Sequence, residues 1–456
     1  MFKRILIANR GEIAVRIIRA CKELGIESVA VYSTADADSL HVKLADKKIC
    51  IGPPPASRSY LNIANIISAA LVTNSDAIHP GYGFLAENHL FVEQVILNNI
   101  TFIGPPPELI DLAGNKSKAI EIMRKNNIPV IPGSINNVEN SEEAVRFARK
   151  TGFPVIIKAA FGGGGRGMRI ANDETELKNL FPLAKVESMN AFGKDDLYIE
   201  KFINKPRHIE FQILGDNYGN IFSPGSRECS IQRRHQKLIE EAPVVNLSER
   251  TADLMQKTAI KAAQALNYKN VGTFEFLVDK YENFYFIEIN TRIQVEHPVT
   301  EMVTGIDLIK EQIKIAAGEN ISALIKDFLQ KNKNNHKSAF GHAIEFRINA
   351  EDAQNNFNPS PGKITNCFIP DGPGIRFDSY ITSGSVIPPY YDSLLGKLII
   401  WGLDREEAVL RANRALNEFK IEGIKTTIPF HLKIIANDNF KKGAINTDFI
   451  EDEKLL

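Results

Sequence analysis

The sequence predicts a mixed α/β protein that begins with a parallel, doubly wound sheet and ends in a β-rich lobe. Over the first 100 or so residues, short apolar runs alternate with helical patterns, which is typical of a parallel sheet covered by helices. Two runs at 272–278 and 284–290 alternate apolar and polar residues, as the strands of a half-buried hairpin do. Between residues 342 and 393, short strand-like runs are separated by Gly- and Pro-rich turns. At 456 residues, the chain exceeds the roughly 250–300 residues at which a single core stops growing, so two to four domains are expected.

The first part of the chain predicts a Rossmann-like domain over residues 1–114. An apolar run at 2–8 precedes a helical pattern at 12–24 and a second strand at 28–32. The pattern continues with a helix near 63–71, a strand near 77–79, a helix near 91–97 and a strand at 101–103. No GxGxxG follows the first strand, so a dinucleotide at that turn is not expected. The prolines at 105–107 lack amide donors and predict a domain boundary at 105–115.

The next segment carries a run of four glycines at 162–165. Such a run costs backbone entropy, and two interpretations explain it. It is either a solvent-exposed hairpin tip or a loop whose amides approach phosphate and close over it. Lys158, at the end of the predicted strand 153–158, and Arg166 favour the phosphate interpretation. A helix at 116–126 precedes this loop and a strand at 198–203 follows it, at an edge of the kind that holds an adenine ring.

A basic stretch follows the predicted strand at 208–214. Such a cluster is usually a solvated basic face. In a chain with equal numbers of basic and acidic residues, 55 each, we favour a role in binding an anionic substrate. Its members between 226 and 238 are Arg227, Arg233, Arg234, His235 and Lys237.

The predicted hairpin at 271–290 places two acids face to face. With the bend between Tyr281 and Glu282, Glu275 lies opposite Glu288, and Asn290 shares the face of Glu288. Like charges at directly opposed positions are destabilising. Two interpretations are therefore open: the two acids are exposed on a solvated strand face, or they hold a divalent cation. Mg²⁺ takes one or two carboxylates plus substrate phosphates, and further polar side chains follow at a two-residue spacing. These are Arg292, Gln294 and Glu296, which favour the metal site.

The remaining elements complete three expected domains. Helices are predicted at 251–266, 311–317 and 321–329, and the polar stretch 330–338 is predicted to be a linker. The β-rich lobe closes with helices at 405–419 and 428–436. The second domain is therefore expected at 115–330, with a mobile lid at about 131–203, and the third at 331–456.

Composition excludes several classes of function. The balanced charge argues against nucleic-acid or membrane binding, and no apolar run approaches the roughly 18 residues that span a bilayer. The four cysteines are scattered without CxxC spacing, which argues against a zinc site or a disulfide framework and favours a reducing cytoplasm. The N-terminus lacks a signal-peptide pattern. No Walker or protein-kinase motif is present, so the phosphate-binding features favour ligase-like activation of a carboxylate or bicarbonate.

Five motifs carry a resemblance to a known family. The segments ILIANRGEIAVRIIRAC, IHPGYGFLAEN, GGGGRGM, ECSIQRRHQK and FIEINTRIQVEHPVTE resemble biotin carboxylase, an ATP-grasp enzyme, from residue 2 to at least Lys397. The resemblance implies an ATP-grasp fold and ATP- and bicarbonate-dependent carboxylation of biotin through carboxyphosphate. Phe161 departs from the small residue expected before the glycine run.

The resemblance also implies roles for residues of this chain. Glu296 would be the general base, and Arg347 would stabilise the biotin enolate, with Tyr82 beside biotin. Two Mg²⁺ or Mn²⁺ ions would bind with ATP at Glu275, Glu288 and Asn290. Bicarbonate would bind Lys237, Arg292, Gln294, Val295 and Glu296, of which Lys237 and Arg292 are also expected to act in catalysis. ATP would contact Lys116, Lys158, Gly164, Gly165, Glu200, Lys201, Ile203, His208, Gln232, His235, Glu275 and Glu288.

Partners follow from the resemblance and from what the chain lacks. No Ala-Met-Lys-Met biotinylation motif is present, so biotin is expected on a separate biotin carboxyl carrier protein, with carboxyltransferase subunits as further partners and a homodimer as the assembly. Acetyl-CoA carboxylase in fatty-acid synthesis, pyruvate carboxylase and another acyl-CoA carboxylase share these motifs and stay open. A catalytically dead scaffold and a more distant ATP-grasp ligase are disfavoured because Glu296, Arg347 and QVEHP are present.

Overall fold

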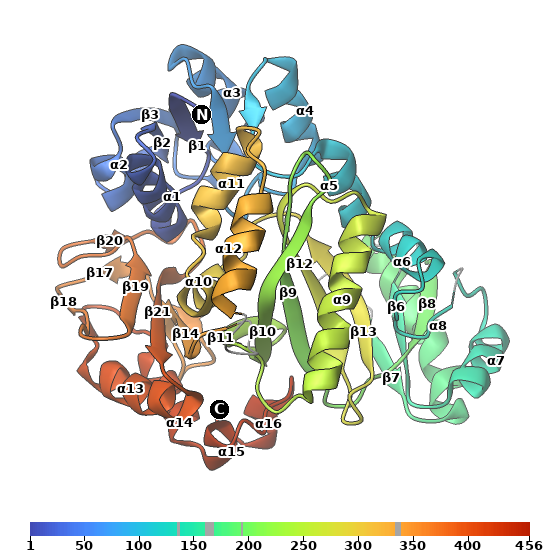
Figure 1. Cartoon of the computed structure of the whole chain (residues 1–456). Coiled ribbons are helices and arrows are strands. Elements are labelled where there is room, and N and C mark those ends of the chain that lie inside the picture. Colours follow the sequence, from blue (N-terminus) through green and yellow to red (C-terminus); the bar gives the residue numbers. More distant parts are fainter. Residues whose placement is uncertain (135–136, 160–167, 193–194, 333–338) are drawn as a thin grey trace.

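The computed structural model describes residues 1–134, 137–159, 168–192, 195–332 and 339–456. Within these residues the chain forms a five-stranded, an eight-stranded and a three-stranded sheet, with three two-stranded pairs. Figure 1 shows the three sheets of three or more strands in separate parts of the molecule, with helices packed over them. The predicted mixed α/β fold is confirmed.

The N-terminal sheet is parallel and has the strand order β3-β2-β1-β4-β5. The order reverses direction between β1 and β4, so the loops that follow these two strands open a crevice. Within the stretch 105–115, where a domain boundary is expected, Pro107 begins helix α5, because proline is well suited to the first helical position. The elements are β1 (Arg4–Ile7), α1 (Gly11–Glu23), β2 (Glu27–Ser33), α2 (Leu40–Leu44), β3 (Lys47–Gly52), α3 (Ile63–Val72), β4 (Ala77–His79), α4 (His89–Leu97), β5 (Thr101–Phe102) and α5 (Pro107–Gly114).

A small antiparallel sheet, β7-β6-β8, forms the outer part of the next segment. Helices α7 and α8, which the sequence did not predict, cover it with a separate apolar core that includes Val155, Leu177 and Ile199. Figure 1 shows this unit at one side of the molecule. Its elements are α6 (Lys116–Lys125), α7 (Ser141–Thr151), β6 (Val155–Ala159), β7 (Arg169–Ala171), α8 (Glu174–Phe192) and β8 (Leu197–Lys201).

The large sheet has the order β13-β12-β9-β10-β11-β14-β21-β19 and is antiparallel. Helix α9 packs on β9 and β10 over a core of Phe211, Phe274 and Phe276. The elements that lead to and cover the sheet are β9 (Arg207–Gly215), β10 (Ile221–Arg233), β11 (Gln236–Ala242), α9 (Glu249–Ala265), β12 (Asn270–Val278), β13 (Phe284–Asn290), α10 (His297–Thr304), α11 (Leu308–Ala316) and α12 (Ser322–Asn332).

The C-terminal part continues the same sheet. Strand β11 pairs with β14, so the sheet crosses the domain boundary predicted near residue 331, and this boundary stays a prediction. The remaining elements are β14 (His342–Asn349), β15 (Glu351–Asp352), β16 (Asn358–Pro359), β17 (Gly362–Lys363), β18 (Asn366–Phe368), β19 (Ile375–Ser379), β20 (Val386–Ile387), β21 (Leu394–Gly402), α13 (Arg405–Glu418), β22 (Lys420–Glu422), α14 (Ile428–Ala436), α15 (Asp438–Lys441) and α16 (Phe449–Asp452).

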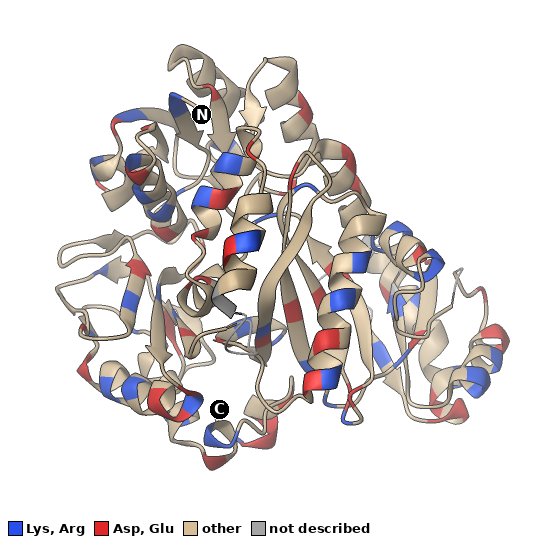
Figure 2. Ribbon diagram, in the orientation of Figure 1, with Lys and Arg blue, Asp and Glu red and all other residues tan. Residues whose placement is uncertain are grey.

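The surface is mixed in charge. Figure 2 shows acidic and basic residues interspersed along the outer helices, α9 and α12 among them. Among the described residues, every helix is too short or too polar to span a bilayer.

Candidate active site

The β12–β13 hairpin places its two acids as the sequence predicts. Glu275 is the direct partner of Glu288, and Asn290 follows on β13 opposite Thr273. The two acids differ in environment, because Glu275 is buried whereas about a third of the Glu288 side chain is exposed. The hairpin therefore presents one carboxylate at the floor of the site and the other at its rim.

Glu275 is held by donors from three elements. His208 on β9 lies 2.7 Å away, Lys237 on β11 donates at 2.9 Å and the Asn290 amide donates at 2.8 Å. Burial alone would raise the pKa of Glu275, but Lys237 and His208 outweigh it and hold this pKa well below its usual range. Glu275 is therefore ionised at neutral pH.

Lys237 is the centre of the charge network. Its Nζ donates to Glu210 at 2.6 Å, to Glu275 at 2.9 Å and to Glu296 at 2.7 Å. Burial would lower the pKa of Lys237, but Cys229 and the carboxylates around it raise this pKa well above its usual value. Three acids thus converge on one permanent cation.

Glu296 joins Lys237 to a second cation. It is fully buried, and Arg347 Nη2 donates to its Oε2 at 2.9 Å. Burial would raise the pKa of Glu296, but Lys237, Arg347 and Arg227 outweigh it and hold this pKa well below its usual range. The same guanidinium donates from Nε to Glu240 at 2.6 Å.

Arg292 lies at the rim beside these groups. Its Nη1 donates to Gln294 Oε1 at 3.0 Å, and its Nη2 donates to Asn290 Oδ1 at 3.3 Å. Its Nε donates to Glu87 at 2.8 Å. The predicted segment 290–296 therefore converges on one site, with its arginine held in place by an acid of the N-terminal domain.

Two of the lysines predicted to bind ATP pair with acids of neighbouring elements. Lys116 Nζ lies 2.7 Å from Glu288, and Lys158 Nζ lies 2.5 Å from Glu200. Lys201 donates to the carbonyl oxygens of Gly152 and Phe153, which occupies its ammonium. The remaining predicted residues differ: Gln232 contacts His208 and Ile203 is half-buried, whereas His235 is exposed, and Gly164 and Gly165 lie outside the described residues.

The basic stretch contributes one residue to the site, and its role in binding an anionic substrate stays a prediction. Lys237 reaches the site, but Arg227 is fully buried and binds Glu210, Gln212, Thr273 and Thr300, so it does not face a substrate. The other members are kept outside the network by the turn between β10 and β11. Arg234 and His235 form that turn with positive φ, and both Arg233 and Arg234 bond Asn356.

Sequence reasoning missed Glu210, Glu240 and Glu87. For Glu210 a signal existed, because it alternates with apolar residues on the same face of its strand as His208. Glu240 and Glu87 meet their partners only through long-range packing. Sequence periodicity gave no signal for either.

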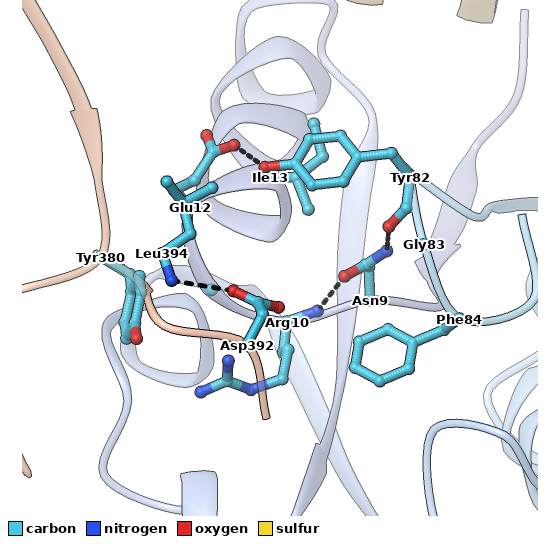
Figure 3. Close-up of a pocket in the computed structure, with 11 residues that line it drawn as sticks. Asn9, Arg10, Glu12, Ile13, Tyr82, Gly83, Phe84, Tyr380, Asp392 and Leu394 are labelled. Carbon is cyan, nitrogen blue, oxygen red and sulfur yellow. Dashed lines mark hydrogen bonds between the residues drawn. The ribbon is translucent and has the colours of Figure 1, made fainter. Parts of the chain in front are cut away.

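Tyr82 lies in a cavity of about 120 Å³ at the crevice between β1 and β4. The Asn9 amide donates to the carbonyl oxygen of Tyr82 at 2.7 Å (Figure 3). It also donates to that of Pro80 at 2.7 Å, and so joins the loop after β1 to the loop after β4. The Tyr82 hydroxyl donates to Glu12, and Glu12 pairs with Lys397 at 3.1 Å. Lys397 in turn donates to the carbonyl oxygen of Val295 at 2.8 Å. A chain of contacts thus links Tyr82 to the segment that carries Glu296.

The donor set fits a hard cation. Glu275, Glu288 and Asn290 offer oxygen ligands at neighbouring positions of one hairpin, which suits Mg²⁺. Two other groups of potential ligands lie within the site, His208 with Glu210 and Glu275, and Glu210 with Cys229 and Glu296. Lys237 already neutralises the acids in both, so a metal is not needed to explain them.

Three family models match the chain. Residues 1–110 match the N-terminal domain of biotin carboxylase, and residues 345–452 match its C-terminal domain. Residues 115–324 match the ATP-binding domain of the carbamoyl-phosphate synthase L chain.

Similar proteins match over nearly the whole length. The sequence is 54% identical over 451 residues to biotin carboxylase of Nostoc sp. (strain PCC 7120), with 99% of each chain covered. It is 49% identical over 452 residues to a pyruvate carboxylase subunit of Methanothermobacter thermautotrophicus, covering 99% of this chain and 90% of that one.

Solved structures match equally well. A biotin carboxylase–β-γ-ATP complex from Campylobacter jejuni gives a TM-score of 0.90 at 49% identity, with 99% of each chain covered. The biotin carboxylase domain dimer of Hydrogenobacter thermophilus 2-oxoglutarate carboxylase, in complex with MgADP, ADP and bicarbonate, gives 0.89 at 46% identity and covers 100% of this chain and 98% of that one.

Proposed function

The chain belongs to the biotin carboxylase family of ATP-dependent ligases, and we propose that it carboxylates biotin on a separate carrier protein as the first half-reaction of an acetyl-CoA carboxylase in fatty-acid synthesis. Residues 1–114 would contact biotin, residues 115–330 would bind the nucleotide, and residues 331–456 would supply the catalytic arginine. Lys237 between Glu210, Glu275 and Glu296 is the observation that carries the proposal.

The nucleotide would lie between the small sheet and the acidic hairpin. Lys116 and Lys158 bring positive charge to this approach, and each is paired with an acid that phosphate would displace. Glu200, Lys201 and Ile203, at the end of β8, would frame the adenine, with His208, Gln232 and His235 on the ribose side. Glu275, Glu288 and Asn290 would hold two Mg²⁺ ions, which when bound neutralise phosphate charge.

Bicarbonate would bind between Arg292, Gln294, the Val295 backbone and Lys237. As it binds, it competes with Glu296 for the cation, so the pKa of Glu296 rises and the carboxylate becomes a better base. A bicarbonate oxygen then attacks the γ-phosphorus of ATP and ADP leaves, while Glu296 accepts the bicarbonate proton. The product, carboxyphosphate, decomposes to CO₂ and phosphate.

Biotin would then react beside Arg347. The released phosphate removes the ureido N–H proton, and the resulting enolate nitrogen attacks CO₂. The guanidinium of Arg347 is permanently charged and forked, which suits it to stabilise the enolate oxygen. Tyr82, at the mouth of the N-terminal crevice, would contact the biotin ring system.

Glu296→Ala tests the proposal. Bicarbonate-dependent ATP cleavage should fall about a hundredfold or more, because a general base contributes roughly that much. Nucleotide affinity, measured by calorimetric titration of MgADP, should stay within about twofold. The control is Glu418→Ala, an exposed acid on α13. Retained turnover in the Glu296 variant would contradict its role as base.

The relatives also support a second acceptor. The similarity to the Methanothermobacter pyruvate carboxylase subunit favours pyruvate as the alternative, because acceptor choice rests with a carboxyltransferase on another polypeptide. Purified biotin carboxyl carrier proteins and carboxyltransferase subunits from the same source distinguish the two. Transfer to acetyl-CoA supports the first proposal, and transfer only to pyruvate supports the second. The dimer of the Hydrogenobacter domain supports a homodimer here, which sedimentation tests.

A further inference from the structure

Two buried acids, Glu240 and Glu345, lie beside Arg347. Strands β11 and β14 pair so that Glu240 and Glu345 are direct partners, and Arg347 follows two residues later on the same face as Glu345. Both acids are completely buried. Opposed residues have β-carbons about 4.5–5.5 Å apart, so the two carboxyl groups are neighbours in the interior.

Three of the four carboxyl oxygens of this pair lack donors among the described residues. Glu240 Oε1 accepts from Arg347 Nε at 2.6 Å. Among the described residues, Glu240 Oε2 and both oxygens of Glu345 have no hydrogen-bond partner. Buried polar groups are nearly always hydrogen-bonded, and three neighbouring acceptor oxygens cannot satisfy one another unless one carboxyl carries a proton.

The surrounding charges leave Glu345 no counter-ion of its own. Its charged neighbours are Arg347 on β14, Glu240 on β11, Lys397 on β21 and Glu296 before α10. Arg347 is shared by Glu240 and Glu296, and Lys397 is engaged by Glu12 on α1 and by the Val295 carbonyl. Ionising Glu345 would therefore place an uncompensated negative charge in the interior.

We propose that Glu345 is a positioning residue for Arg347: it is protonated in the resting protein and donates a hydrogen bond to Glu240 Oε2. Glu240 is then fixed at both oxygens, by Arg347 on one side and by Glu345 on the other. Burial raises the pKa of Glu345 well above its usual value. Burial also raises the pKa of Glu240, to about 7, because burial and the Glu296 carboxylate together outweigh the opposing effect of Arg347. These directions agree with one proton held between the two acids.

The consequence for the reaction rests on the proposed role of Arg347. A fixed Glu240 holds the edge of the guanidinium that carries Nε and Nη2, both 2.6 Å from its Oε1, so that Nη2 stays within 2.9 Å of Glu296 and beside the proposed reacting centre. A charged Glu345 would instead add a third acid near Arg347. When Glu345 is protonated, the guanidinium of Arg347 keeps its orientation and no further negative charge is added near it.

Infrared spectroscopy of the resting protein tests the proton directly. A protonated carboxyl group has a carbonyl stretch that is separate from that of a carboxylate, and it shifts in deuterated buffer. The wild-type protein should show such a band at neutral pH, and Glu345→Gln should lose it. A spectrum in which Glu345→Gln removes no such band would overturn the proposal.

Two variants of similar size test the positioning role. Gln at 345 can donate to Glu240 and should keep kcat/KM for biotin within about threefold, whereas Glu345→Leu lacks a donor and should lose about tenfold or more. Equal activity of the two, or equal loss in both, contradicts the role. If Glu345→Leu does not fold, Glu240→Gln gives the second measurement, because removing the acceptor charge should shift the Glu345 carbonyl band, and an unshifted band counts against the proposal.

The outcomes separate this inference from the proposed function. Absence of bicarbonate- and biotin-dependent ATP cleavage in well-folded wild-type protein would refute the proposed function while the infrared band still reports the proton on Glu345. An active wild-type protein without that band refutes only the inference.

Discussion

The ammonium of Lys237 lies 2.7 Å from the carboxylate of Glu296, so in the resting protein the proposed base is neutralised by a group expected to bind bicarbonate. The same ammonium also contacts Glu210 and Glu275. Any anion that draws Lys237 away must therefore change the charge balance of all three acids.

Replacing Lys237 by Gln should lower kcat/KM for bicarbonate by about a hundredfold, because a preorganised charge at the reacting anion is lost. Leaving three buried acids without their cation should also lower the unfolding temperature. Initial rates at varied bicarbonate, with a thermal melt, measure both. Lys257→Gln, at an exposed position on α9, is the control, and unchanged bicarbonate kinetics in Lys237→Gln would exclude the residue from the site.

Removing Mg²⁺ with a chelator should stop ATP cleavage, and excess Mg²⁺ should restore it. Glu288→Gln should raise the Mg²⁺ concentration needed for half-maximal rate by about tenfold or more, since losing even an outer partner of a metal ligand costs 10–100-fold in affinity. The same variant frees Lys116 from its 2.7 Å pair, so nucleotide affinity is measured separately. An unchanged Mg²⁺ requirement would place the metal elsewhere.

Glu241 should make stability depend on pH in the acid range. Burial would raise its pKa, but His342 and Arg405 outweigh it and lower the pKa from 4.5 to about 2. A depressed acid contributes its full stability above the unfolded pKa and loses it as the pH falls from about 4.5 towards 2; a shift of this size corresponds to about 3 kcal/mol.

Denaturant unfolding of wild type and of Glu241→Gln, measured from pH 7 down to the lowest pH at which both stay folded, checks this. The variant should be less stable than wild type at pH 7, and the difference should shrink as the pH falls. Glu418→Gln, which removes an exposed pair with Arg414, should show little change at any pH. A difference independent of pH would mean that Glu241 acts through packing alone.

The sequence predicted the acidic hairpin because every part of it is local. Both strands and the turn are contiguous, and a period of two fixes which side chains share a face, so Glu275 and Glu288 could be paired by counting. Arg347 and Glu240 are 107 residues apart, and no local pattern says that β11 pairs with β14. The network around Glu296 therefore needed the structure.

The basic stretch shows a different limit. Composition alone does not distinguish a cation that is buried among acids from one that faces solvent. Arg227 lies inside the sheet, and Arg234 and His235 occupy a two-residue turn. Residue type favoured an anion site in this region and the family resemblance pointed to Lys237, but strand pairing shows why Lys237 is the member that reaches the acids.

The sheet that crosses residue 331 has a consequence for how the chain can be divided. A fragment that ends there would keep both hairpin acids but lose β14, and with it Arg347. The freed side of β11 would present unpaired backbone groups beside the buried Ile239, and such an edge invites pairing with another copy. We expect that fragment to self-associate, whereas a cut within the small β7-β6-β8 unit would leave the long sheet intact.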